Sequence, residues 1–72
     1  MTWNHRVVKV MEYGEPLYLM CEVFYDEGGK PQGYSEPSTV SESIEGLQLI
    51  LTRMSQALTL PVLDAETDFK EA

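Results

Sequence analysis

The sequence contains one cysteine and one histidine, and this scarcity excludes several kinds of site. Cys21 has no partner for an intrachain disulfide, and Cys21 and His5 together supply only half of the four ligands of a structural zinc site. We therefore expect no metal and no cofactor. The two residues also fall on opposite faces of the predicted sheet, because side chains alternate along a strand. This placement argues against a thiol–imidazole dyad, and we expect no catalytic residues and no enzymatic activity.

Positive charge is also scarce, with five lysines and arginines against twelve acids and a net charge of −7. Direct nucleic-acid binding needs a basic surface that displaces counterions. The bases are scattered along the chain, so we expect no such binding. The acidity fits a solubilising surface. It leaves open a basic protein partner, or an inhibitor that mimics nucleic-acid charge through a row of acids at Glu12, Glu15, Glu22, Asp26, Glu27 and Glu36.

Long apolar runs are absent. No stretch approaches the roughly 20 residues that span a bilayer, and the N-terminal segment has no uninterrupted apolar region of the kind found in secretory signals. We expect no membrane association. A lone thiol is typical of a reducing compartment, and we expect a cytoplasmic location.

The first half of the chain predicts three strands. Residues 3–11 are β-branched around Val7, Val8 and Val10 and end at a Tyr-Gly-Glu-Pro turn over residues 13–16, and residues 17–25 form the strongest strand pattern. The glycine-rich segment 26–31 predicts a hairpin turn, after which residues 32–36 return as a weaker third strand. The short connections favour an antiparallel meander in chain order.

The second half of the chain predicts one helix over residues 42–58. Either Thr39 or Ser41 could cap its N-terminus, since Thr39 with Glu42 fits a capping box. Pro61 ends the helix. The apolar positions recur on one stripe at Ile44, Leu47, Leu51, Met54 and Leu58.

These patterns predict an α+β fold, in which a three-stranded antiparallel β-meander is followed by one C-terminal helix packed on one face (βββα). We expect residues 1–63 to form this single domain. From residue 64 the chain is acidic and aperiodic, and we expect residues 64–72 to be a disordered acidic tail.

The strand over residues 17–25 is apolar on both faces. One face carries Leu19, Cys21, Val23 and Tyr25, and the other carries the only charge, Glu22. We therefore assign the first face, with Val8 and Val10, to the helix. Leu47, Leu51, Met54 and Leu58 should pack there, and Leu51→Ala should cost about 2–5 kcal/mol of stability.

The opposite face would remain open, because one helix covers only one side of a three-stranded sheet. Exposed apolar patches of this kind mark interfaces. We expect a homodimer through this face or through an edge strand, and an interaction module, an adapter or regulator, as the function. An alternative is a small ligand-binding protein or enzyme with its site near His5 and Glu22. The candidate partner-binding residues are Trp3, His5, Tyr18, Met20, Glu22 and Phe24.

Three segments carry a resemblance. They are residues 3–8 (Trp-Asn-His-Arg-Val-Val), residues 22–34, which begin Glu-Val-Phe-Tyr-Asp-Glu, and residues 61–63 (Pro-Val-Leu). They resemble a group of short bacterial proteins of unknown function with a Trp-Asn-Tyr-Arg-Val-Val start, a Glu-Val-Tyr-Tyr-Asp-Glu hairpin and a Pro-Val-Leu end. Here His5 and Phe24 stand where that pattern has tyrosines. The resemblance covers nearly the whole chain. It implies a free-standing cytoplasmic protein of a bacterium or phage, and it implies no activity.

Overall fold

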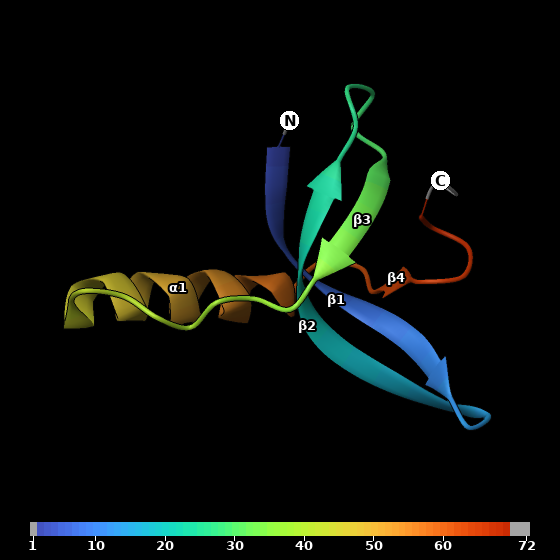
Figure 1. Cartoon of the computed structure of the whole chain (residues 1–72), viewed down its shortest axis with the longest axis horizontal. Helices are drawn as coiled ribbons and strands as arrows, with labels where there is room; N and C mark the ends of the chain where they lie inside the picture. The colour runs from blue at the N-terminus through green and yellow to red at the C-terminus, as the bar shows by residue number, and fades with distance from the viewer. Residues whose placement is uncertain (1, 70–72) are drawn as a thin grey trace.

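The computed structural model describes residues 2–69 and has an α+β fold, with one helix and a mixed sheet of four strands (Figure 1). The order of the strands across the sheet is β3-β2-β1-β4. The elements in chain order are β1 (Thr2–Glu12), β2 (Glu15–Tyr25), β3 (Pro31–Ser35), α1 (Ile44–Ala57) and β4 (Leu63–Asp64).

The predicted antiparallel pairing of the first three strands is confirmed. β1 and β2 pair over their whole length, from Thr2 opposite Tyr25 to Glu12 opposite Glu15. Tyr13 and Gly14 make the turn between them, with φ of 52° and 80°. Positive φ at both central residues gives a turn whose twist matches that of the flanking strands. β3 then pairs antiparallel with the end of β2 after the predicted glycine-rich turn.

The helix begins two residues later than predicted, and a different residue caps it. Ser43 has extended backbone angles, and its hydroxyl accepts a hydrogen bond of 3.0 Å from the Gly46 N–H. This bond satisfies one of the donors that a helix N-terminus leaves free. The cap is therefore Ser43 rather than Thr39 or Ser41. A Cβ at Gly46 would collide with the Ser41 hydroxyl, which explains a glycine inside the helix.

The helix is not the last element of the fold, and this corrects the predicted βββα order. After Pro61 the chain turns back to the sheet, where β4 pairs parallel with β1 at Val8 and Lys9. The Ala65 N–H donates to the Lys9 carbonyl at 2.9 Å. The sheet is therefore mixed, with four strands instead of three.

The core lies between the sheet and residues 63–69. Val8, Cys21 and Val23 are its buried centre, as the alternation of the strands predicts. However, the expectation that α1 covers them is wrong, because the side chains packed on them from outside the β1–β2 pair are Leu63, Ala65 and Phe69. Residues 64–69 therefore differ from the expected disordered tail, and residues 70–72 lie outside the described residues.

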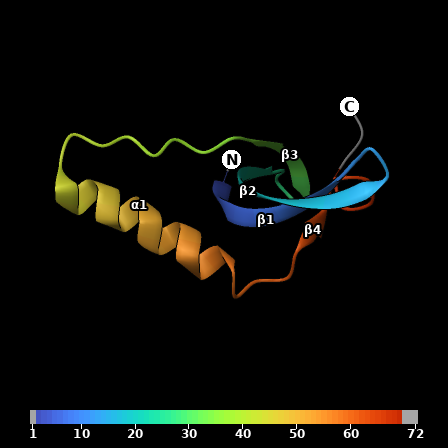
Figure 2. The ribbon, with the colours of Figure 1, turned by 90° about the horizontal axis from the view of Figure 1, so that it is seen from below.

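The helix projects away from the sheet. Figure 2 shows residues 36–43 running out from the sheet in an extended conformation, with α1 returning beside them to β1. Ala57, in the last turn, is the one buried residue of α1. Leu51, expected in the core, is 51% exposed. Since a half-exposed side chain has less contact to lose, the expected cost of Leu51→Ala does not hold for the isolated chain.

Candidate functional site

The six candidate residues from the sequence lie together on one face of the β1–β2 pair. Trp3 lies opposite Phe24, and His5 lies opposite Glu22. Further along, Met20 pairs with Val7 and Tyr18 pairs with Lys9. These pairs are two residues apart, so their side chains point to the same side of the sheet. We call this surface the outer sheet face.

The outer sheet face is unevenly exposed. Trp3 and Tyr18 are 47% and 62% exposed, whereas Met20, Glu22 and Phe24 are half-buried. His5 is only 6% exposed. The sequence could not predict this difference, because it depends on where α1 returns to β1.

His5 and Glu22 do not form the predicted pair. The His5 ring packs edge-on against Trp3, with ring centres 5.4 Å apart, and its buried Nε2 has no hydrogen-bond partner among the described residues. Glu22 Oε2 accepts a long bond of 3.4 Å from the Ser38 N–H. The two side chains therefore make no proton relay in this arrangement.

A pocket of about 450 Å³ separates the start of β1 from the end of α1. Its walls mix apolar and polar groups, with Arg53 as the only charged side chain. Because His5 Nε2 is buried, a molecule in the pocket cannot reach it. The pocket could hold a small anion against Arg53 and Trp3, but Glu22 is not part of it. The lining residues are Trp3, Asn4, His5, Arg53, Gln56, Ala57 and Leu60.

A second hollow, of about 570 Å³, lies where β3 ends beside β2. Cys21 is at its base and is buried. Burial raises the pKa of the Cys21 thiol, and the nearby Glu36 carboxylate raises it further. A thiol of this kind stays protonated at neutral pH and is a poor nucleophile. Cys21 therefore contributes to the fold by packing in the core.

A polar network that the sequence did not suggest lies on the core side of β1. Arg6 donates to the Tyr25 hydroxyl at 3.1 Å and to the Pro61 carbonyl at 2.7 Å. The Tyr25 hydroxyl in turn donates to Asn4 Oδ1 at 2.7 Å. The one sign of this network in the sequence is that residues 4 and 6 are two apart on a strand and therefore lie on the same face. The network ties the segment after α1 to the sheet and has no catalytic geometry.

Exposed apolar residues outnumber buried ones in the described chain. Five apolar residues are buried, whereas fourteen large hydrophobic residues are exposed. Most of them gather at the outer sheet face, on α1 with its flanking segments, and on the part of the β1–β2 ribbon that β3 does not cover. The ribbon residues are Met11, Tyr13, Leu17, Tyr18 and Leu19.

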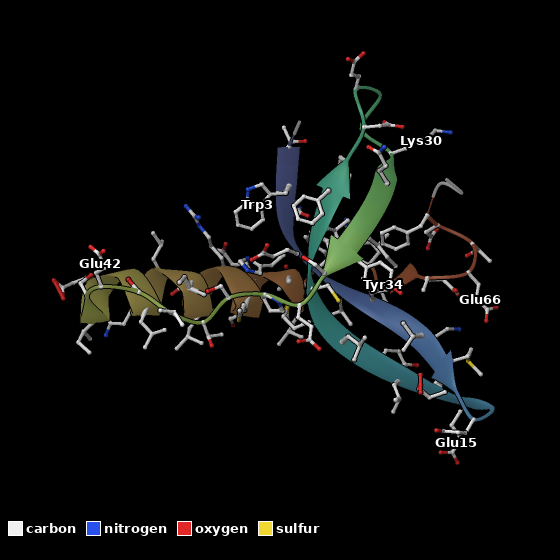
Figure 3. All side chains as sticks on the ribbon, viewed as in Figure 1. Trp3, Glu15, Lys30, Tyr34, Glu42 and Glu66 are labelled. Carbon is white, nitrogen blue, oxygen red and sulfur yellow. The ribbon has the colours of Figure 1, made fainter. Side chains whose placement is uncertain are left out.

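The acids are dispersed. Glu12 and Glu15 lie opposite each other at the tip of the β1–β2 ribbon, whereas Asp26 and Glu27 follow the other end of β2. In Figure 3, Glu15 and Lys30 mark these two opposite ends. At about 3.3 Å per residue, the 11 residues of β2 separate the two groups by roughly 35 Å. The predicted row of acids is therefore not continuous.

Residues 2–69 contain neither a metal-ligand cluster nor a membrane-crossing helix. No three side chains of the His, Cys, Asp and Glu types gather as metal ligands would within this range. In the same part of the chain, α1 lacks the length and apolarity that a membrane-crossing helix needs.

Comparison with known proteins adds no relative. No protein-family model, curated protein or solved structure matches the chain. The function is therefore argued from the chain's own surface.

Proposed function

We propose that this protein is a non-enzymatic interaction module, an adapter or regulator that presents an apolar surface to a protein partner. The observation that carries the proposal is the exposure of aromatic side chains on the outer sheet face. Tyr18 is 62% exposed there, and Trp3 is 47% exposed. Tryptophan and tyrosine are the residues that most often dominate binding energy at protein interfaces.

The composition of this face fits the binding of a protein better than it fits catalysis. Phe24 and Met20 lie beside Trp3 and Tyr18 as half-buried apolar neighbours. Aromatic residues and methionine are enriched in the centres of interfaces. The one acid, Glu22, is held by the Ser38 backbone rather than poised as a base. The face can therefore supply contact area with a fixed shape.

The charge of the chain indicates what kind of partner fits. A net charge of −7 attracts a basic protein over a distance set by the ionic strength. Because the acids are dispersed over both ends of the sheet, this attraction would steer a partner rather than specify it. Specificity would then come from the aromatic residues of the outer sheet face.

Affinity capture from the lysate of the source cell tests the proposal with a matched pair of variants. Tyr18→Asn removes an exposed ring from the outer sheet face, and Tyr13→Asn removes an exposed ring from the turn. Asparagine tolerates the positive φ at residue 13. We expect a basic protein that the wild type and Tyr13→Asn retain and that Tyr18→Asn loses. If all three baits recover the same proteins, the outer sheet face is not the binding surface.

The pocket beside Trp3 favours a second candidate, a small-molecule-binding protein. Arg53 would select a carboxylate, and the Trp3 ring would pack against its apolar part. Trp3 is the only tryptophan, so its fluorescence reports this pocket. Titration with a panel of aromatic carboxylates should give a saturable change that Arg53→Gln abolishes. An unchanged emission across the panel would eliminate this candidate.

A further inference from the structure

Helix α1 has an apolar stripe of which only part is covered in the described chain. Ile44 and Leu58 are 70% and 69% exposed, and Leu51 between them is 51% exposed. Figure 3 shows Glu42, just before the helix, at the end farthest from the sheet. Most of the helix therefore stands in solvent, and these three positions of its stripe face water.

The spacing of this stripe is that of a helix-pairing seam. Ile44, Leu51 and Leu58 follow one another at intervals of seven residues, and Leu47 and Met54 fall three residues after the first two. Alternating steps of three and four residues define the a and d positions of a heptad. Leu47 and Met54 are half-buried, whereas the three a positions are exposed.

The flanks of the seam are uncharged. In this heptad the flanking e and g positions are Gln48, Ser55, Ile50 and Ala57, whereas Glu45 and Arg53 lie further round the helix. Two copies of a chain with a net charge of −7 repel each other. The helix stripe is a surface on which two copies can meet without bringing like charges into contact.

The direction of pairing follows from the acids. Glu42 and Glu45 lie at the N-terminal end of α1, and no basic residue lies in its last turn. A parallel pair would place these acids of both copies at the same end of the dimer. An antiparallel pair separates them, and it sets each helix N-terminus beside the C-terminus of the other, as helix dipoles favour.

We propose that α1 pairs antiparallel with α1 of a second copy of this chain, with Leu51 near the centre of the seam. The pairing is two-fold symmetric and therefore closed at a dimer. At 14 residues, or about 21 Å, the helix is short for an isolated pair. The segment 36–43 runs beside it (Figure 2), and Val40 in this segment is 80% exposed and adds apolar surface. This surface is separate from the outer sheet face, so it goes beyond the proposed function.

Two leucines on the same helix provide a matched test. Leu51 and Leu49 are 51% and 52% exposed, but Leu49 points away from the seam. Glutamate is a good helix former, so Leu51→Glu and Leu49→Glu change charge and helix propensity alike. Sedimentation velocity over a concentration series measures the dimer dissociation constant. We expect Leu51→Glu to raise it by at least about tenfold, because the new carboxylates meet at the centre of the seam, and Leu49→Glu to leave it close to wild type.

Three results would overturn the proposal. If the wild-type protein is monomeric at about 100 μM, the two helices do not pair as proposed. Equal effects of the two leucine variants would show that the seam is not the contact. A disulfide between two copies of Glu45→Cys that forms more efficiently than at a random-collision site such as Glu27→Cys would show parallel pairing. The Tyr18→Asn variant should keep the wild-type dissociation constant, so failure here and failure of the proposed function are distinguishable.

Discussion

At the scale of single residues, Arg6 is the side chain that joins the two halves of the fold. It extends from β1 to the Tyr25 hydroxyl on β2 and to the Pro61 carbonyl after α1. Arg6 is half-buried, and burial of a charged group costs stability unless its donors are hydrogen-bonded. Its Nε has no partner among the described residues, so the two remaining bonds carry the interaction. The position at which the chain returns to the sheet therefore depends on Tyr25.

Tyr25→Phe tests this dependence. The substitution keeps the ring and removes the hydroxyl that accepts from Arg6 and donates to Asn4. We expect a loss of about 1–3 kcal/mol in the free energy of unfolding, because a charged donor is left without its acceptor. Urea denaturation at one fixed protein concentration measures it. Tyr34→Phe is the control, since Tyr34 packs its ring against Phe69. Equal stabilities of the two variants would contradict the role given to the network.

At the scale of elements, the segment from Leu63 to Phe69 closes the core. Asp64 organises it, because Oδ1 accepts from the Glu66 N–H at 2.8 Å and Oδ2 lies 3.2 Å from Lys9 Nζ. Asp68 Oδ2 accepts from the Asp64 N–H at 2.7 Å, which closes the turn. The turn places Phe69 on the core and against Tyr34. A stretch that reads as an acidic tail therefore folds because its acids accept local hydrogen bonds.

Asp64→Asn should show a pH-dependent effect. The backbone hydrogen bond from Glu66 lowers the pKa of Asp64 in the folded protein, and Lys9 lowers it further. Because its pKa is lowered in the folded protein, ionised Asp64 stabilises the fold at pH values above the ordinary pKa of an aspartate. This contribution is lost as the pH falls through the lowered pKa. Thermal unfolding should therefore separate the variant from wild type at about pH 7 and bring them together once the pH falls below the lowered pKa of Asp64. A gap of the same size at both pH values would show that charge is not involved.

Phe69→Ser tests whether residues 63–69 cover the core in solution. The partly buried ring packs on the cluster of Val8, Cys21 and Val23, so its loss should cost about 2 kcal/mol. Cys21 is the only cysteine and reports the opening directly. Iodoacetamide should modify it faster in this variant than in wild type. Glu66→Gln, at an exposed position of the same turn, should leave the rate unchanged. A wild-type rate in Phe69→Ser would instead fit the disordered tail expected from the sequence.

At the scale of the whole molecule, two arms extend from a small core. One arm is the β1–β2 ribbon, and the other is α1 with residues 36–43 (Figure 1, Figure 2). A chain of 72 residues buries only about 60% of the surface that it exposes when unfolded. Arms of this kind reduce that fraction further. The most direct way to recover stability is to bury the arms against another chain, as the proposed α1 pairing does.

Salt should strengthen this pairing. With a net charge of −7, two copies repel each other through solvent, and added salt screens that repulsion. The seam itself is uncharged, so screening removes no attraction from it. Sedimentation should give a lower dimer dissociation constant at about 500 mM than at about 20 mM NaCl. Leu51→Glu should show the weaker association at both salt concentrations. A dissociation constant that rises with salt would mean that ion pairs hold the dimer.

The sequence by itself determined the features that depend on neighbouring residues. The antiparallel strands, the glycine-rich turn and the helix follow from local propensity, and the grouping of the candidate residues on one face follows from alternation along the strands. These patterns repeat over short distances, so a single sequence contains them in full. They also identified Val8, Cys21 and Val23 correctly as one apolar group.

Only the tertiary structure decided what covers each face. The sequence offers two apolar segments, α1 and residues 63–69, and a sheet that is apolar on both sides. Which segment reaches Val8 depends on the path of the chain after Pro61 and on the reach of Arg6 to its carbonyl. The Ser43 cap likewise sets the angle at which α1 leaves the connecting segment. Whether a side chain is buried depends on residues that are far apart in the sequence. The period of a helix and the alternation along a strand show which apolar residues share a face, but they do not show what packs on that face.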